Sequence, residues 1–316
     1  MNKFIVQAKE TGERLDKFLA RKFPQYSRAY LQKQIQKGGV QINAHSEKSN
    51  YKLKAGDKIV VAIKPPEAIS LAPEKDIPLE IIYEDRDLIV INKPAGIVVH
   101  AGVKNLKHTL VNALIAHYPL LGQVGDEPNV RPGIVHRLDK DVSGLMVVAK
   151  NNQSFAYLKN LFKTRQIKKI YACLSWGKFQ EEKGEIRLPI ASNPKNPSRM
   201  VAVQNPRDPL NQKAKSACTE FKILKQFDKT ALIKVYLKTG RRHQIRVHFK
   251  SIGHPLVNDR LYGYRRQIFL GSGRIFLHAT QLEFVLPQGK EMKFISPLPE
   301  DLEKILNLES GIMNQE

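Results

Sequence analysis

Residues 131–141 have the sequence RPGIVHRLDKD, and the apolar run GLMVVA follows at residues 144–149. An apolar run of this length predicts a strand buried inside a sheet. The polar side chains before it then lie in a loop at the end of that strand, where catalytic groups are commonly held. Asp139 stands between Arg137 and Lys140, whose charges favour its ionised form. The loop therefore indicates either a structural ion pair or a catalytic carboxylate.

The chain around this loop mixes strands and helices without strict βαβ alternation. Residues 169–176 alternate, with Tyr171 on the face opposite Ile170 and Ala172. The apolar residues of 243–251 have helical spacing, and Gly253 just after them is a typical end of a helix. This mixture is typical of an α+β domain with a mixed, mainly antiparallel sheet. Further strands are predicted at residues 81–83, 88–92 and 231–237, and a further helix at residues 154–163.

The first 64 residues form a separate pattern, that of a small basic α/β module. They hold 14 Lys and Arg against five Asp and Glu, a net charge of +9. Leu15, Phe18 and Leu19 have helical spacing, and Ser27 suits the cap of a second helix. Four prolines in residues 64–78 indicate a semi-extended linker. The expected organisation is a module at residues 1–64, a linker at 65–78, a second domain at 79–300 and a C-terminal tail at 301–316.

The charge of the whole chain indicates its partner. It carries 52 Lys and Arg against 30 Asp and Glu, a net charge of +22. Such an excess repels itself unless a polyanion neutralises it, so nucleic acid is the expected partner and no protein partner is required. No apolar run approaches the ~18 residues of a membrane span, and residues 1–10 lack the apolar region of a secretory signal. Cys173 and Cys218 stand alone, which favours a reducing, cytoplasmic location.

Other kinds of chemistry fit the sequence less well. Asp139 and Asp141 could be the two carboxylates of a glycosidase. Their basic surroundings, however, keep both ionised, so neither could act as the general acid. Histidines such as His136, His243 and His248 have neither HExxH nor cysteine-paired spacing, so no metal site is expected. P-loop and GxGxxG motifs are absent, and no cofactor is expected.

Six ordered motifs make the chain similar to the RluA-type pseudouridine synthases. PGIVHRLDKDVSGLMVVAK at residues 132–150 resembles the signature of that family. Residues 13–61 resemble the S4 RNA-binding module that often precedes its catalytic domain. The other motifs are INKPAGIVVH at 91–100, RQIKKIY at 165–171, TGRRHQIRVH at 239–248, HPLVNDRLYG at 254–263 and LHAT at 277–280.

The resemblance implies roles for individual residues. Asp139 matches the catalytic aspartate, Tyr171 the tyrosine that stacks on the target base, and Arg246 the arginine that pairs with the aspartate. Arg137 matches the residue that helps to displace the target nucleotide from its stack. Substrate binding is further expected of His136, Arg241, Arg242 and His243. In the S4-like module, RNA contacts are expected of Arg14, Lys17, Arg21, Arg28, Lys33 and Lys37, with a solvated charged face as the alternative.

The implied reaction converts uridine into pseudouridine without redox change or energy input. The N1–C1′ bond breaks, the uracil turns, and C5 joins C1′. An ionised aspartate can act as nucleophile on the sugar or as base at the 2′ carbon, and the sequence leaves both routes open. The target base must first leave its stack. The basic residues of 159–169 can then grip the flanking phosphates.

The RNA target and two other functions stay open at this point. An S4 module combined with PGIVHRLDKD resembles the enzymes that act on large-subunit (23S) ribosomal RNA, and transfer RNA is the alternative substrate. A non-catalytic S4-type RNA-binding protein explains the charge but not the matches at Asp139, Tyr171 and Arg246. A nucleic-acid glycosylase uses an aspartate and an extruded base as well, but it releases the free base.

Overall fold

The computed structural model describes residues 2–63, 71–102, 105–264 and 273–311, and the chain divides into two compact units, Met1–Ala68 and Ile69–Glu316. The division lies inside the predicted linker, of which residues 65–70 are outside the described residues. No helix among the described residues has the length and apolar character of a membrane span.

The N-terminal unit packs two helices on a small antiparallel sheet with the order β1-β4-β2-β3. Phe18 and Leu19 of the first helix and Leu31 of the second are fully buried, as their helical spacing requires. The Ser27 hydroxyl accepts a hydrogen bond from Tyr30 N and caps the second helix. The elements are β1 (Asn2–Ile5), α1 (Leu15–Lys22), α2 (Arg28–Gln36), β2 (Val40–Ile42), β3 (His45–Ser46) and β4 (Lys58–Val61), with a 3₁₀ turn at Ala8–Glu10.

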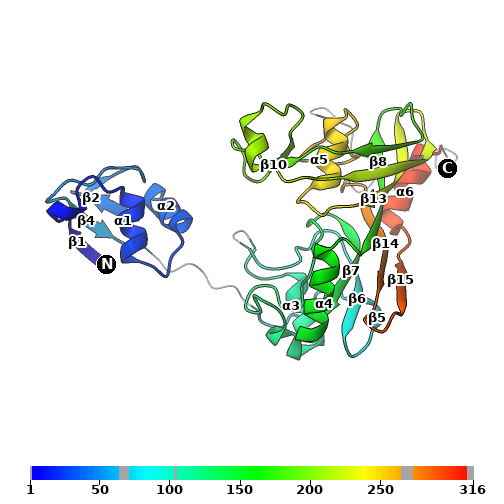
Figure 1. Ribbon diagram of the computed structural model, residues 1–316, viewed down its shortest axis with the longest axis horizontal. Helices are drawn as coiled ribbons and strands as arrows, with labels where there is room; N and C mark the ends of the chain where they lie inside the picture. Colours follow the sequence, from blue (N-terminus) through cyan, green and yellow to red (C-terminus); the bar gives the residue numbers. More distant parts are fainter. Residues whose placement is uncertain (1, 64–70, 103–104, 265–272, 312–316) are drawn as a thin grey trace. The chain divides into compact units, whose positions relative to one another are not determined.

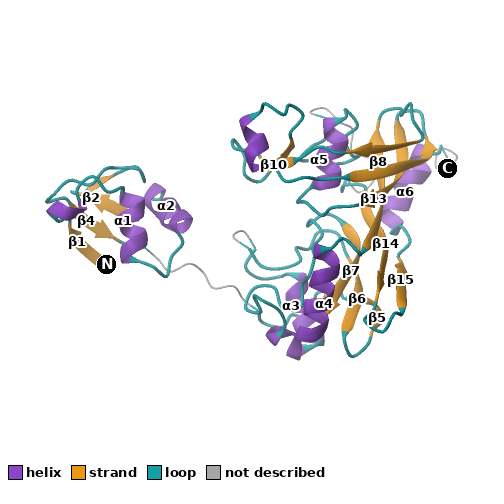
Figure 2. Ribbon diagram, viewed as in Figure 1, coloured by secondary structure: helices purple, strands orange, loops and turns teal. Residues whose placement is uncertain are grey.

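The second unit is built on one nine-stranded sheet, shown in orange in Figure 2. Its order is β5-β6-β7-β14-β8-β13-β12-β9, and β15 pairs with β14 outside this path. Only the pairing of β7 with β14 is parallel among the described ladders of this sheet. The α+β class with a mixed, mainly antiparallel sheet is therefore confirmed. The strands are β5 (Glu80–Glu84), β6 (Leu88–Lys93), β7 (Ser143–Ala149), β8 (Lys168–Trp176), β9 (Lys183–Ile186), β12 (Thr219–Gln226), β13 (Thr230–Leu237), β14 (Leu277–Val285) and β15 (Glu291–Ile295).

Helices cover two regions of this sheet. α3 (Leu110–His117) and α4 (Asn152–Lys163) lie beside the β5–β7 end, and α5 (Gln244–Ser251) lies beside β12 and the small β10–β11 pair. β7 is buried at every position, as the run at residues 144–149 predicts. The remaining elements are β10 (Ile190–Ser192), β11 (Met200–Ala202) and 3₁₀ turns at Pro119–Gln123 and Pro209–Lys213.

Gly144 fixes how closely β7 and β14 approach. Its φ of +120° is a conformation that side chains rarely adopt, and a Cβ there would lie 2.4 Å from the backbone of Ala279. Gly144 pairs with Ala279 where the two strands run parallel. The loop that carries Asp139 therefore ends at a point held tightly in the middle of the sheet.

Two expected segments differ from the prediction. Residues 301–316 were expected to form a tail, but Glu300–Glu309 forms helix α6, whose Leu302 and Ile305 are fully buried against Leu174 and Phe276. Residues 312–316 are outside the described residues.

The second half of the predicted linker also belongs to the large unit. Leu71 packs against its core, Ala72 O accepts a hydrogen bond from Asn112 Nδ2 at 2.8 Å, and Glu74 accepts one from His108 N. Proline and missing periodicity exclude a helix or an inner strand, but they allow an extended segment to pack on a domain surface.

Candidate active site

A cleft of about 490 Å³ opens where the loop before β7, the end of α4, the strand β8 and the turn into α5 meet. Its described lining has one acidic side chain, that of Asp139, among eight Lys and Arg side chains. The excess of positive charge attracts a polyanion, and Asp139 is the one carboxylate that this polyanion would meet in the described lining. The basic lining residues are Arg137, Lys163, Arg165, Lys169, Lys238, Arg241, Arg242 and Arg246.

Asp139 is held by a buried arginine that a second carboxylate fixes. Arg246 Nη1 donates to Asp139 Oδ2 at 3.0 Å, while Nε and Nη2 donate to the two oxygens of Asp259 at 2.8 Å each. Burial works against the charge of Arg246, but its bonds with Asp259 and then Asp139 outweigh burial and raise its pKa. The resemblance predicts that Arg246 pairs with Asp139, and one hydrogen bond joins them, whereas two donors of the guanidinium bind Asp259.

Asp259 is a site residue that the sequence analysis did not single out. It is buried, and its Oδ1 also accepts hydrogen bonds from the backbone N–H groups of Leu261 and Tyr262. Those donors fix the carboxylate, which in turn fixes the arginine. Asp259 lies in the motif HPLVNDRLYG, so its position in the sequence was noted without its function.

One oxygen of Asp139 faces the cleft without a hydrogen bond. Among the described residues no hydrogen bond reaches Oδ1, and His243 Nε2 lies 3.8 Å from it. The side chain is 17% exposed, so a small group in the cleft can approach it. The carboxylate is thus oriented through Oδ2 and open through Oδ1.

Tyr171 lies in β8 and contributes to the wall of the same cleft. It is only 7% exposed, because β8 is buried on both faces. Burial raises the pKa of its phenol, and the charge of Asp139 raises it further. The tyrosine is therefore a neutral phenol near neutral pH, with a flat face and a hydroxyl in the cleft.

His136 lines the cleft, but its imidazole ring is already bonded to other parts of the protein. Its Nε2 accepts a hydrogen bond from Val147 N at 3.0 Å, and its ring stacks on Phe162 with centroids 4.5 Å apart. Burial, and then the charge of Lys169, lowers the pKa of His136 to about 3. His136 is neutral and ties the loop to β7, so in this structure it forms part of the wall. In α4, Leu161 is buried in the core and Phe162 lines the cleft.

The other predicted substrate-binding residues also line the cleft. Arg137 is exposed at its rim. Arg241 Nε donates to Ser216 O at 3.1 Å, and Arg242 Nη2 donates to Pro197 O at 2.7 Å. Arg242 Nε also donates to Met200 Sδ at 3.1 Å, and these bonds orient both guanidinium groups. His243 precedes α5 and contacts Tyr262.

Basic residues at the end of α4 and the start of β8 line another side of the cleft. Lys163 and Arg165 are exposed, and Lys169 lies over the ring of Phe162 at 5.6 Å. Burial, and then the charge of Arg165, lowers the pKa of Lys169 to about 8. Lys169 therefore keeps its charge at neutral pH and can meet a phosphate beside the cleft.

The arginines of the S4-like module are more involved in ion pairs than the sequence suggested. Arg14 and Arg28 both donate to Asp16, which is fully buried, and Arg21 donates to Glu10 and Glu13. Acids therefore compensate all three arginines, although their side chains remain 36–50% exposed. Lys17, Lys33 and Lys37 are exposed, and within the described residues no ion pair involves them.

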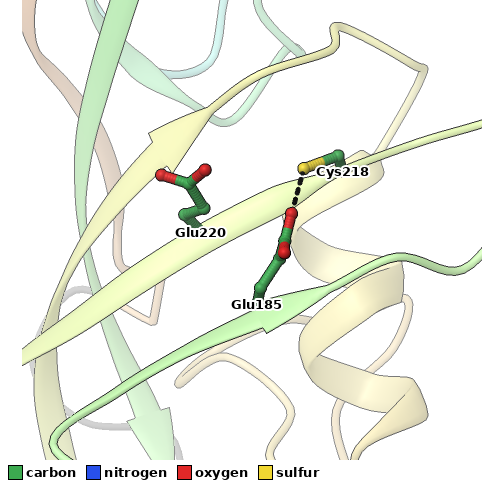
Figure 3. A group of neighbouring side chains, drawn as sticks. All are labelled: Glu185, Cys218 and Glu220. Carbon is green, nitrogen blue, oxygen red and sulfur yellow. Dashed lines mark hydrogen bonds between the residues drawn. The ribbon is translucent and has the colours of Figure 1, made fainter.

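One cluster outside the cleft has the residue types of a metal site. Figure 3 shows Glu185, Cys218 and Glu220, with the Cys218 thiol donating to Glu185 at 2.8 Å. Burial, and then Glu185, raises the pKa of Cys218 to about 11, so the thiol stays protonated. Glu185 is paired with Arg187, and Glu220 is paired with Lys238. The carboxylates are neutralised by these cations, and the cluster is a surface ion-pair network.

Residues 87–251, which include Asp139, Tyr171 and Arg246, match the RNA pseudouridylate synthase family, and residues 13–59 match the S4 domain. The chain belongs to the RNA pseudouridylate synthase family. Like the other members it is an isomerase that converts uridine in RNA to pseudouridine. The resemblance drawn from the motifs is confirmed, as is the S4 module.

Relatives align with this pseudouridine synthase over nearly its whole length. An uncharacterized RNA pseudouridine synthase of Bacillus subtilis is 39% identical over 97% of this chain and 98% of its own. The ribosomal large subunit pseudouridine synthase D of Nitrosomonas europaea is 39% identical over 93% of this chain and 84% of its own. The solved structure of human RNA pseudouridylate synthase domain containing 1 has 26% identity and a TM-score of 0.56, and covers 74% of this chain and 86% of its own.

Proposed function

We propose that this pseudouridine synthase modifies uridines of large-subunit ribosomal RNA and that Asp139 is its catalytic carboxylate. The observation that carries the assignment of Asp139 is its place in the cleft. It is the one acid in the described lining, oriented by Arg246 through Oδ2 and open through Oδ1. The proposal for the RNA target is supported by relatives named ribosomal large subunit pseudouridine synthase D, at 36–39% identity.

The open oxygen of Asp139 suits either known way of breaking the glycosidic bond. As nucleophile, Oδ1 attacks C1′ while the N1–C1′ electron pair leaves with the uracil. As base, it removes the 2′ proton while the same pair leaves. Both need an ionised carboxylate, and Arg246 supplies the charged hydrogen-bond donor that orients it. Neither route requires a cofactor.

Tyr171 and Arg137 have complementary tasks in this proposal. The flat face of Tyr171 supports the uracil while it turns. Its neutral hydroxyl can relay the C5 proton by accepting it while giving its own proton to the Asp139 carboxylate. Arg137 stands exposed at the rim of the cleft. From there its side chain can occupy the gap that an extruded nucleotide leaves in the RNA.

The RNA target is tested by mapping pseudouridines in a deletion strain. Ribosomal and transfer RNA from the strain and its parent are treated with carbodiimide and sequenced by primer extension. We expect stops in large-subunit RNA that disappear on deletion and return with the wild-type gene. Lost sites in transfer RNA alone would contradict the proposed target and leave the reaction intact.

The role of Asp139 is tested with Asp139→Asn. This variant is nearly isosteric but cannot act as nucleophile or base, so we expect no tritium release from [5-³H]uridine RNA and RNA affinity within a few-fold of wild type. Asp141→Asn, a change of the neighbouring acid in the same loop, is the matched control and should stay active. Turnover by the Asp139→Asn protein would refute the assignment.

A further inference from the structure

His243 has a backbone conformation that calls for an explanation. It is the residue before the first turn of α5, with φ +56° and ψ +21° in the left-handed region. Residues other than glycine adopt this region infrequently, and such residues gather at functional sites. The side chain is 15% exposed and lines the cleft beside Asp139. The left-handed turn thus aims an imidazole at the catalytic carboxylate.

The hydrogen bonds around His243 determine which ring nitrogen carries the proton. Tyr262 Oη accepts a hydrogen bond from Met200 N at 2.7 Å and lies 2.8 Å from His243 Nδ1. Its own proton then has His243 Nδ1 as its acceptor among the described residues. An imidazole that accepts at Nδ1 carries its proton on Nε2.

The charge of Asp139 selects the same tautomer. Nε2 lies 3.8 Å from Asp139 Oδ1. A proton on Nε2 turns a positive N–H end toward the carboxylate, whereas the other tautomer turns a lone pair toward it. Two independent contacts, with Tyr262 and with Asp139, therefore place the proton on the nitrogen that faces the cleft.

His243 is a neutral donor near neutral pH. Burial lowers the pKa of its ring, Asp139 and Asp259 oppose this effect, and the cations Arg246 and Arg242 add to it. The distance of 3.8 Å is too long for a hydrogen bond with Asp139. The Nε2–H group consequently has no acceptor among the described residues and is free for one that enters the cleft.

The reaction supplies an acceptor at this place. When the N1–C1′ bond breaks, its electron pair stays on the uracil, and the negative charge is shared by O2 and O4. By either route Asp139 Oδ1 acts at C1′ or at the adjacent C2′, and O2 is the uracil oxygen next to N1. We propose, on the basis of the proposed function, that His243 is a catalytic residue whose Nε2–H donates a hydrogen bond to O2 of the target uracil. No proton is transferred, and the bond strengthens as charge develops on O2.

The test uses a synthetic RNA stem-loop that carries the mapped target uridine. The target is made as uridine, as 2-thiouridine or as 4-thiouridine, and single-turnover rates are measured by chromatography of the nucleosides. Sulfur is a poor acceptor, so 2-thiouridine weakens the proposed bond. Each RNA is given to the wild type and to His243→Asn. Asparagine tolerates the left-handed backbone, so the fold at α5 is kept, but its amide does not reach the Nε2 position.

We expect His243→Asn to lower the rate on uridine by about 10- to 100-fold, with RNA affinity nearly unchanged. The ratio of the wild-type rate to the variant rate should fall toward one with 2-thiouridine and stay large with 4-thiouridine. Comparing enzymes on the same RNA cancels the intrinsic effect of sulfur on the leaving group. Tyr262→Phe, which frees Nδ1 but keeps the aromatic ring, should show an intermediate rate on uridine.

A variant rate within two-fold of wild type on uridine would overturn the inference. So would a rate ratio that is equally large with uridine and 2-thiouridine, because His243 would then act only through the structure. A Tyr262→Phe rate equal to wild type would contradict the tautomer argument. If the wild type itself converts no uridine, the proposed function fails, which is a different result from any of these.

Discussion

Arg246 divides its donors between two carboxylates that differ in exposure. Asp259 is buried and receives two bonds from the guanidinium and two from the backbone, whereas Asp139 receives one bond and keeps an open oxygen. The buried carboxylate therefore sets the orientation, and the open one is available for reaction. A planar fork with three separate donor positions is needed for this division, and a lysine ammonium cannot supply it.

Arg246→Lys should lose more activity than conservation of charge suggests. We expect a fall in kcat of about 100-fold, because one ammonium cannot satisfy Asp259 and orient Asp139 together. The variant should also unfold at a lower temperature, since breaking a buried pair costs about 3–5 kcal/mol. Arg131→Lys, which changes a surface arginine paired with Glu127 outside the cleft, is the control for both measurements. A rate within two-fold of wild type would refute the orienting role.

Tyr171→Phe separates the ring of the tyrosine from its hydroxyl. The phenylalanine keeps the flat face, so RNA affinity should be unchanged. Loss of the hydroxyl should slow release of the C5 proton, by about 10- to 100-fold if it assists that transfer. Tritium release measured against loss of uridine shows which step is slowed. An unchanged rate of tritium release would mean that the ring acts only as a platform.

At the scale of elements, the end of β6 is tied to the loop that carries Asp139. Lys93 is fully buried at the end of β6, and its Nζ donates to the carbonyl oxygens of Pro94, Ile97 and Lys140 at 2.7–3.1 Å. Lys140 is the neighbour of Asp139. A buried lysine with three backbone acceptors thus links two segments that are 47 residues apart in the chain.

Lys93→Met should reveal this link as a pH-dependent difference in stability. Burial lowers the pKa of Lys93 from 10.5 to about 7, against the charges of Asp141 and Asp139. Between pH 7 and 10.5 the unfolded chain therefore binds more protons than the folded one, and the wild type gains stability as pH rises. Methionine leaves the carbonyls without a donor, at about 1–3 kcal/mol, and removes the titration.

Denaturant unfolding at pH 7, 8 and 9 measures both effects. The variant should have a lower free energy of unfolding than the wild type. The difference between the two proteins should increase by up to about 1.4 kcal/mol per pH unit. Lys150→Met, which removes a lysine paired with Glu84 near the surface, is the control and should show no such widening. Parallel stability curves for wild type and Lys93→Met would contradict the lowered pKa.

The elements that the sequence predicted well are those with a local signal. Helical spacing predicted α1, α2, α4 and α5, and the run at residues 144–149 predicted β7. Contacts across long separations could not be predicted in this way. Asp259 joins Arg246 only because the chain turns back after α5. Helix α6, which follows Pro299, packs on Leu174 of β8.

At the scale of the whole molecule, the enzyme combines two units with separate cores. The N-terminal unit has its own buried cluster, in which Leu15, Phe18 and Leu31 take part, and the large unit has the cleft. The first 64 residues carry a net charge of +9, and they belong to the unit that does not contain Asp139. Its contribution is therefore expected in RNA affinity and not in the chemical step.

Deletion of residues 1–70 should raise KM for ribosomal RNA and leave kcat at saturation nearly unchanged. Loss of phosphate contacts should also flatten the salt dependence of binding by about 3 to 6 units of log–log slope. Both proteins are assayed at two salt concentrations on a minimal stem-loop and on full-length large-subunit RNA. The effect should be small on the stem-loop, which serves as the control. An unchanged salt slope on the long RNA would refute the binding role of the S4 module.

The position of β14 in the sheet has a consequence for how the enzyme is made. This strand, Leu277–Val285, lies between β7 and β8 although it is synthesised more than a hundred residues after either. Until it emerges from the ribosome, the edges of β7 and β8 have no partner, and the walls that carry Asp139 and Tyr171 are not joined. Domains built from such distant pairings fold late and slowly. We therefore expect each molecule to become active only after residues 277–285 have been translated, and a chain released before that point leaves strand edges unpaired and prone to aggregate.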